Sequence, residues 1–187
     1  MNNMEKFNIV LTELPEKVLR KRSQEVALPL SDEDKELAER MIYHIDDSQT
    51  EGTKFRPGVG VAAVQYGILK RAFYVFVQTE DHKVLFKDVL FNPKLVYKSD
   101  KKIALAEGEG CLSVPEDWPN QEGYVHRSEK IVVEAYSYNE GKFMRFTLSG
   151  YLAIVFQHEL DHLDGKLFID RIKQKSPWLK NKNAKYL

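Results

Sequence analysis

The sequence predicts an α+β fold in which antiparallel β-sheets pack around a central helix that carries a His-Glu-x-x-His motif. The first reason is that segments rich in β-branched and aromatic residues dominate the middle of the chain, as they do in strands. The second is that Tyr151 to Phe156 is nearly all apolar, which is typical of a helix buried on most sides by sheets. Because the 187 residues contain no repeat and no linker, residues 1–187 are expected to form one domain.

A first helix is predicted to begin after Ser31. The run Ser31 to Asp34 has the pattern of a capping box, in which polar side chains satisfy the free N–H groups of the first turn. Leu37, Met41 and Ile45 would then lie along one apolar face. We interpret His44 as a surface residue near the C-terminus of this helix, and residues 47–57 as a surface loop.

Four strands are predicted downstream of this loop. They span Ala72 to Val77, Val89 to Tyr97, Ile131 to Tyr138 and Lys142 to Leu148. Asn139 to Gly141 is expected to form the hairpin turn between the last two strands. Ser149 is expected to cap the following helix, and Asp164-Gly165 to end it.

This second helix carries the pattern His158-Glu159-Leu160-Asp161-His162. Two imidazoles at positions i and i+4 lie roughly 40° apart around a helix, so both can reach one metal ion, with Glu159 beside them. The alternative is a buried helix with two hydrogen-bonded histidines and no metal. Their spacing, with a glutamate after the first histidine, favours the metal site.

The only cysteine, Cys111, is the candidate third ligand. Structural zinc sites usually fill four positions with several cysteines, which this chain lacks. One thiolate and two imidazoles would leave a position for water, as in catalytic sites. A lone cysteine is more often a small buried hydrophobe, so this interpretation depends on the two histidines. The apolar residues after Gly110 indicate that Cys111 lies on an extended segment.

A third segment, Pro57 to Gly67, crowds small residues around the amide of Gln65. Such a segment places backbone close to a ligand and offers the amide as a hydrogen-bond donor. A phosphate-binding loop is excluded, because the segment lacks both the third glycine of the dinucleotide fingerprint and a Gly-Lys-Ser/Thr sequence.

Together, these segments resemble the peptide deformylases. The family has a Gly-x-Gly-x-Ala-Ala-x-Gln run, a Glu-Gly-Cys-x-Ser run and a His-Glu-x-Asp-His helix. This chain matches them in order at Gly58 to Gln65, Glu109 to Ser113 and His158 to His162, and the similarity covers most of residues 10–170. The longer spacings resemble the larger, Gram-positive-like type. One departure is Val64, where the family commonly has a proline that would stiffen the turn holding Gln65.

The resemblance implies a metal-dependent hydrolase that removes the N-formyl group from the initiator methionine of nascent chains and releases formate. It implies Cys111, His158 and His162 as metal ligands, and Fe(II) as the cellular metal, for which zinc, nickel or cobalt can substitute. Glu159 would be the general acid and base. The amide of Gln65 and the backbone N–H of Leu112 would hold the oxyanion. The substrate would contact Val59, Gly60, Gly110, Arg127, Tyr151, Ile154 and Val155, with Arg127 near the mouth of the side-chain pocket.

Alternatives remain at this stage. A zinc peptidase also uses His-Glu-x-x-His, but it usually takes its third ligand from a downstream His or Glu, and none follows His162. A peptide-binding module without turnover would not need Glu159. Asp161 either orients a ligand or pairs with a nearby basic residue, and Trp118 either faces substrate or packs on its neighbours.

The charges of the chain cancel, with 28 basic and 28 acidic residues, so no global field attracts nucleic acid. The N-terminal residues lack the pattern of a signal peptide, no apolar run is long enough to cross a membrane, and the chain has a single cysteine, so a cytoplasmic location is expected. A monomer is also expected. The tail, residues 171–187, has six basic residues and no acidic ones. It is expected to be either a solvated, partly disordered terminus or a weak contact with the ribosome.

Overall fold

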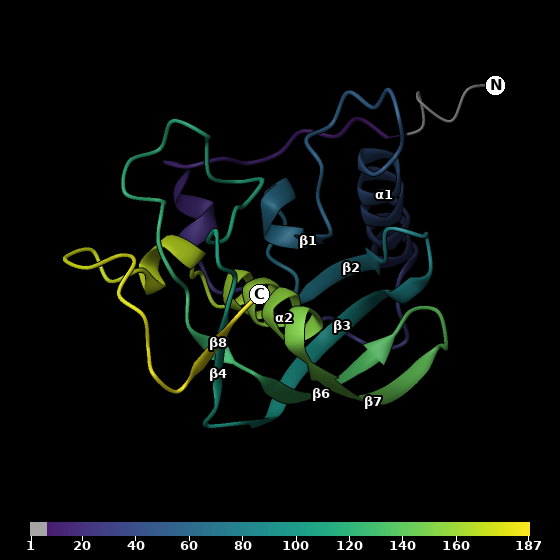
Figure 1. The fold of residues 1–187 in the computed structure, drawn as a ribbon. Helices are drawn as coiled ribbons and strands as arrows, with labels where there is room; N and C mark the ends of the chain where they lie inside the picture. The colour runs from purple at the N-terminus through teal and green to yellow at the C-terminus, as the bar shows by residue number, and fades with distance from the viewer. Residues whose placement is uncertain (1–6) are drawn as a thin grey trace.

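The computed structural model describes residues 7–187 and contains two β-sheets that both pack against one helix (Figure 1). The first sheet has the strand order β1-β2-β3-β6-β7, and every neighbouring pair is antiparallel. Its strands are β1 (Gly60–Ala62), β2 (Ala72–Gln78), β3 (Val84–Lys98), β6 (Lys130–Ser137) and β7 (Lys142–Ser149). The second sheet has the order β5-β4-β8, from β5 (Arg127–Ser128), β4 (Lys102–Ala104) and β8 (Ala184–Tyr186). The predicted α+β class is confirmed, although β4 and β8 are parallel.

Two α-helices and three short 3₁₀ helices complete the described structure. They are α1 (Asp32–Ser48), α2 (Gly150–Leu163), η2 (Lys17–Arg20), η3 (Ala63–Tyr66) and η4 (Phe168–Arg171). None of the helices within residues 7–187 combines the length and apolar character needed to cross a membrane. Met1 to Lys6, where the sequence shows no signal-peptide pattern, lie outside the described residues.

Helix α1 forms as predicted, with one error at His44. The Ser31 side chain accepts the N–H of Asp34, and the Asp34 carboxylate accepts the N–H of Ser31, which completes the capping box. His44 is fully buried rather than at the surface, and its Nδ1 lies 2.8 Å from the hydroxyl of Tyr66. The prediction missed this because Tyr66 lies on η3, which packs against α1 only in the folded chain.

Strand β2 explains why the two helices lie on opposite faces of the first sheet. Six of its seven residues are buried, since alternate side chains point to opposite faces. Phe73 and Val75 belong to the core cluster around α2, whereas Tyr74 and Phe76 pack in the cluster with α1. Apolar residues therefore cover much of α2. Its polar side chains can be satisfied only where another segment places a polar group beside the helix.

The start of α2 differs from its prediction in detail. Ser149 occupies the N-cap position, but its side chain makes no capping hydrogen bond. Ser149 is also the last residue of β7, where it pairs with Lys130, and the N–H of Gly150 donates to the carbonyl of Glu129. The helix ends as predicted at Asp164, followed by Gly165 with φ of +71°.

The expected strands are confirmed within two residues, except at β3 and at Cys111. Strand β3 begins at Val84, five residues before the predicted start, and its exposed first residues pair with the end of β2. Cys111 lies in a loop and not on a strand, because Val114 donates to the Cys111 carbonyl and turns the chain. This turn lets the thiol point toward α2.

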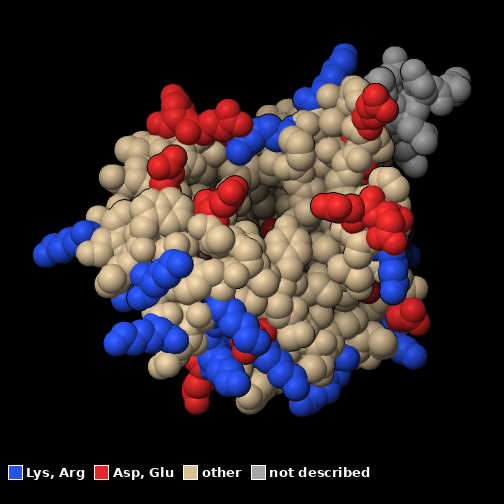
Figure 2. Space-filling view, viewed as in Figure 1, with Lys and Arg blue, Asp and Glu red and all other residues tan. Residues whose placement is uncertain are grey.

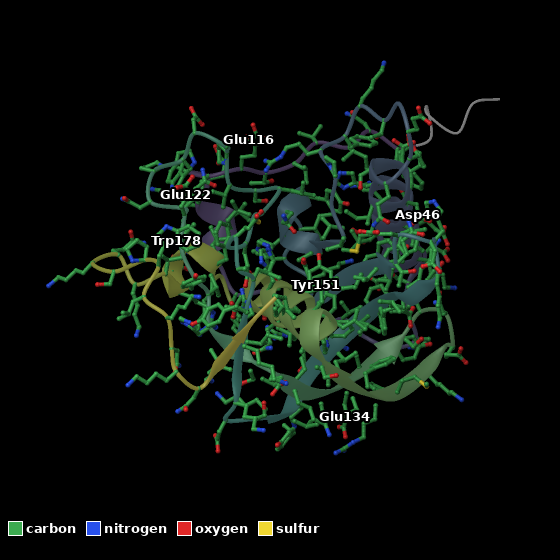
Figure 3. The ribbon with its side chains drawn as sticks, in the orientation of Figure 1. Asp46, Glu116, Glu122, Glu134, Tyr151 and Trp178 are labelled. Carbon is green, nitrogen blue, oxygen red and sulfur yellow. The ribbon has the colours of Figure 1, made fainter. Side chains whose placement is uncertain are left out.

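The C-terminal segment docks on the body of the protein. Strand β8 pairs with β4, and the Leu187 N–H donates to the Ala104 carbonyl. The Trp178 and Tyr124 rings meet edge to face at 5.0 Å. Figure 3 shows Trp178 beside η4, where the tail leaves the body. The tail therefore contacts the body through β8 and Trp178, while most of its residues are exposed to solvent, as a solvated terminus would be.

Candidate active site

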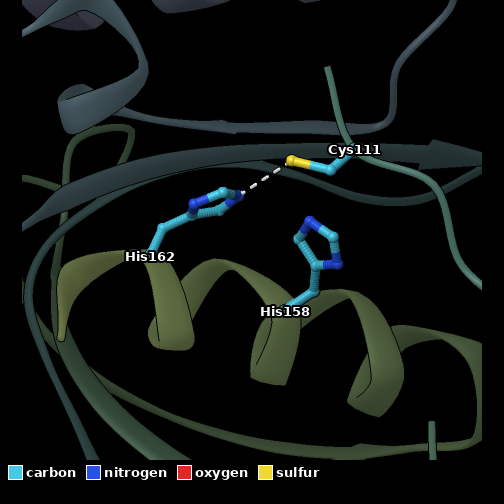
Figure 4. A group of neighbouring side chains, drawn as sticks. All are labelled: Cys111, His158 and His162. Carbon is cyan, nitrogen blue, oxygen red and sulfur yellow. Dashed lines mark hydrogen bonds between the residues drawn. The ribbon is translucent and has the colours of Figure 1, made fainter. Parts of the chain in front are cut away.

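Three potential metal ligands converge between α2 and the loop that follows β4. His158 and His162 project from successive turns of α2 toward the Cys111 thiol (Figure 4). One ligand atom from each lies within 4.8 Å of the others, and Cys111 Sγ is 3.4 Å from His162 Nε2. Cys111 is 7% exposed and His162 1%, so the group is shielded from water on most sides.

The donor atoms fit a divalent transition-metal ion. Burial opposes ionisation of the Cys111 thiol, but the His162 and His158 rings lower its pKa to about 5, so the thiolate form that binds metals is favoured. The Nδ1 of His158 is hydrogen-bonded to Glu109 at 2.8 Å. The Nε2 of that ring is therefore left for the centre of the group. Thiolate and imidazole are suitable ligands for Fe(II), Zn, Ni and Co, so the donor atoms do not by themselves choose among these ions.

Glu159 has the environment of a general base. Its side chain is 4% exposed, and its Oε2 has no hydrogen-bond partner among the described residues. Burial raises the pKa of Glu159, an effect that the two imidazoles reduce. A carboxylate whose pKa is raised is a stronger base than an exposed glutamate, so it can accept a proton and later return it. The carboxylate faces Gly60 of β1, where a side chain would collide with it.

The Gln65 amide and Leu112 line the cavity beside Cys111. Gln65 Oε1 accepts the Ala62 N–H at 3.0 Å, which orients Nε2 toward Ser113 Oγ at 3.0 Å and Cys111 Sγ at 3.8 Å. Gln65 is 1% exposed. Among the described residues the N–H of Leu112 donates no hydrogen bond, so it is free to donate toward a ligand beside Cys111. Gln65 could donate to the same ligand in place of its long contact with Cys111 Sγ.

The functional residue that sequence reasoning missed is Glu109. Its carboxylate binds His158 Nδ1 and also accepts two hydrogen bonds from Arg127, at 2.7 and 2.9 Å. Although burial opposes its ionisation, the charge of Arg127 and the bond from His158 lower the pKa of Glu109 to about 2. A carboxylate that holds the second nitrogen of a ligating histidine fixes its tautomer and orientation. The available signal was its place two residues before Cys111 in the matched motif.

Beside this group the surface is hollowed into a cavity of about 540 Å³. Figure 2 shows its opening near the centre of the view, and Figure 3 places Tyr151 there. The cavity is lined by six of the seven predicted substrate contacts, namely Val59, Gly60, Gly110, Tyr151, Ile154 and Val155, together with Gln65, Cys111, Leu112, His158 and Glu159. Most of the wall is apolar.

Arg127 is the predicted contact that the structure places elsewhere. Its side chain is 2% exposed and is fully engaged with Glu109 and Asp161. It does not line the cavity in the described structure, so the prediction that it lies at the pocket mouth is wrong. The reason is that two buried carboxylates need a cation, and Arg127 on β5 supplies it. Asp161 thus pairs with basic residues, and Trp118 is half-buried against the core rather than in the cavity.

A family model described as polypeptide deformylase matches residues 9–178. The chain belongs to the polypeptide deformylase family. Among its relatives, a peptide deformylase of Mycoplasmopsis pulmonis is 55% identical over 94% of this chain and 96% of that protein. One from Lacticaseibacillus casei is 46% identical over 87% of this chain and 88% of that protein.

Solved deformylase structures share this fold. A class I type b peptide deformylase from Acinetobacter baumannii, with Met-Ala-Ser bound, has a TM-score of 0.73 and 28% identity, covering 88% of this chain and 98% of that one. The peptide deformylase of Ehrlichia chaffeensis also gives 0.73, with 30% identity and 89% coverage of both chains. Family membership confirms the resemblance, and the Lacticaseibacillus relative agrees with its Gram-positive-like character.

Proposed function

We propose that this chain removes the N-formyl group from the initiator N-formylmethionine of nascent polypeptides and releases formate. The observation that carries this proposal is the convergence of Cys111, His158 and His162 beside a largely apolar cavity, whose wall includes Cys111, His158 and Glu159. The deformylase match over residues 9–178 supports treating residues 1–187 as one catalytic domain.

Cys111, His158 and His162 would hold one divalent metal ion. Such an ion, when bound, lowers the pKa of water to about 7 and polarises a carbonyl group. We propose Fe(II) as the cellular metal, with zinc, nickel or cobalt as substitutes, because a mixed thiolate and imidazole set accepts all of these ions.

Glu159 then moves the proton. Its buried carboxylate accepts a proton from the attacking water and returns it to the amine that leaves when the C–N bond of the formyl group breaks. Its raised pKa favours the return step, and such acid and base catalysis contributes typically about 10²–10⁴-fold.

Gln65 and Leu112 stabilise the oxygen of the formyl group. As the formyl carbon becomes tetrahedral, this oxygen gains negative charge, which Gln65 Nε2 and the Leu112 N–H can meet with hydrogen bonds. The bonds that Gln65 makes to Ala62 and Ser113 hold its amide in position before substrate arrives, so no reorganisation is needed during the reaction.

The cavity would select an unbranched apolar side chain. Val59, Tyr151, Ile154 and Val155 line it, and residues 151, 154, 155 and 158 share one face of α2. A methionine side chain in this pocket would place its formylated nitrogen beside Glu159. The Met-Ala-Ser bound to the Acinetobacter relative supports a product with an N-terminal methionine.

The test is formate release by anaerobically Fe(II)-loaded protein from formyl-Met-Ala-Ser. We expect one free amino terminus for each formate, and no reaction with acetyl-Met-Ala-Ser. Absence of formate would overturn the proposal. Release of free methionine from Met-Ala-Ser would instead identify a peptidase.

We also propose a cytoplasmic monomer that meets its substrate at the ribosome. In the tail, Arg171 and Lys185 are paired with Asp161 and Glu129, which leaves four lysines for a weak, salt-sensitive contact with ribosomal RNA. They are Lys173, Lys175, Lys180 and Lys182. Changing all four to glutamine should weaken cosedimentation with ribosomes at low salt. The rate of formate release from short formyl peptides should not change. Unchanged cosedimentation would exclude this contact.

A further inference from the structure

A row of alternating charges leads from His158 to the C-terminal segment. His158 Nδ1 binds Glu109, and Arg127 holds Glu109 with two hydrogen bonds. Arg127 Nη1 also donates to Asp161 Oδ2 at 2.9 Å. Asp161 in turn accepts two hydrogen bonds from Arg171, both at 2.6 Å. The row therefore begins at a proposed metal ligand and ends on η4.

The last member of this row is far more exposed than the buried charges before it. The side chains of Arg127, Glu109 and Asp161 are 2%, 3% and 10% exposed, whereas Arg171 is 42% exposed. Two carboxylates and two guanidinium groups balance each other. Without Arg171, two buried carboxylates would share the single charge of Arg127, and a buried charge that loses a partner is strongly unfavourable.

The sharing of Arg127 determines how firmly Glu109 is held. Asp161 Oδ2 accepts from both Arg127 and Arg171. If Arg171 is lost, Arg127 is the only cation left to neutralise the charge of Asp161. Arg127 then moves toward Asp161, and its two hydrogen bonds to Glu109 become weaker. Glu109 then fixes the His158 ring less firmly, because its carboxylate is itself less restrained.

We propose that Arg171 is a positioning residue for His158, acting through Asp161, Arg127 and Glu109, so that docking of the C-terminal segment and retention of the metal are coupled. The inference rests on the proposed metal centre, and it assigns a role to a residue that sequence alone placed only in a basic tail. It also gives Asp161 both of the roles that the sequence left open.

The chain offers a closely matched control in Arg20. Its side chain is 41% exposed and pairs with Asp170, the residue before Arg171, at 2.5 Å. This ion pair also anchors η4, but it has no link to Arg127 or Glu109 in the described hydrogen bonds. A loss of anchoring alone should affect Arg20→Met and Arg171→Met alike.

The experiment uses Co²⁺ as the probe and no peptide. Protein loaded with Co²⁺ is mixed with excess chelator, and the decay of the thiolate-to-cobalt absorption gives the dissociation rate. We expect Arg171→Met to release Co²⁺ about three to ten times faster than wild type. Arg20→Met should match wild type, and Arg171→Lys, which keeps the charge but not the paired bonds, should fall between. Equal rates in wild type and Arg171→Met, or equal acceleration by Arg20→Met, would overturn the proposal.

A double-mutant cycle tests the route. Glu109→Gln should accelerate release about 10- to 100-fold, since Glu109 contacts the ligand directly. Adding Arg171→Met to Glu109→Gln should then change the Co²⁺ dissociation rate little, because the link from Arg171 to His158 through the Glu109 carboxylate is already lost. Additive effects would show that Arg171 acts by another path. Failure of wild type to bind Co²⁺ would refute the metal centre itself, whereas normal binding without formate release would refute only the proposed reaction.

Discussion

The substitution Gly60→Ala tests whether the position of the Glu159 carboxylate controls the reaction. A Cβ at residue 60 would lie 2.7 Å from Glu159 Oε1 and 3.2 Å from the carbonyl oxygen of Tyr74. The Tyr74 carbonyl belongs to β2 and cannot move without the sheet. The carboxylate must therefore move, by about 0.7 Å to reach ordinary contact distance.

A displacement of this size should mainly reduce the rate of the chemical step. Misplacement of a catalytic group by about 1 Å can cost about 10²-fold, so we expect kcat to fall about 10- to 100-fold. The added methyl lies nearest to Glu159 and not to a proposed ligand, so the metal content should stay at the wild-type level. The assay is formate release from formyl-Met-Ala-Ser, with metal per chain determined on the same sample.

Gly110→Ala is the matched control. Gly110 lines the same cavity, but no atom lies within 4 Å of a Cβ built there. A methyl group at this position can narrow the cavity and raise KM, while kcat should stay close to wild type. The reasoning is refuted if Gly60→Ala keeps a wild-type kcat, or if Gly110→Ala lowers kcat as much as Gly60→Ala does.

Three further predictions address the thiolate, the pocket and a buried histidine. Cys111→Ser replaces a soft thiolate by a poorly ionised oxygen, so metal binding or turnover should collapse; a serine variant with full metal and full activity would make Cys111 only a packing residue. Ile154→Trp should raise KM for formyl-methionyl peptides more than for formyl-glycyl peptides, and equal effects would remove Ile154 from the pocket. Burial lowers the pKa of His44 from 6.5 to about 4, so between these values the unfolded chain binds more protons than the folded one, and stability falls as the pH falls. In denaturant titrations from pH 7 to 4, wild type should lose up to roughly 3 kcal/mol more than His44→Phe; a difference between the two proteins that does not change with pH would contradict this.

The sequence predicted those parts of the fold that depend on local pattern. The capping box at Ser31 and the apolar face of α1 are local features, and the structure has both. The burial of His44 depends on η3, which packs against it from 22 residues away in sequence. Sequence periodicity cannot report such a contact, because the partner comes from a separate element.

In the candidate site, too, local pattern predicted some residues, whereas contacts between distant segments placed the others. Helical spacing placed His158 and His162 on one face, and the resemblance to deformylases implied Cys111 as the third ligand. The structure brings all three together. The spacing could not predict Glu109 or the true place of Arg127. Their positions follow from buried charge compensation, which links β5, α2 and the loop before Cys111. Charge balance of this kind becomes visible only when the burial of each partner is known.

In the proposed reaction, Glu159 transfers the proton beside a metal that Cys111, His158 and His162 hold. The most direct measurement compares wild type with Glu159→Gln, recording formate release from formyl-Met-Ala-Ser and metal per chain on the same samples. Glutamine keeps the size of the side chain but cannot accept the proton. The account predicts an unchanged metal content and a loss of at least about 10²-fold in turnover. Near wild-type turnover in fully metallated Glu159→Gln would contradict it.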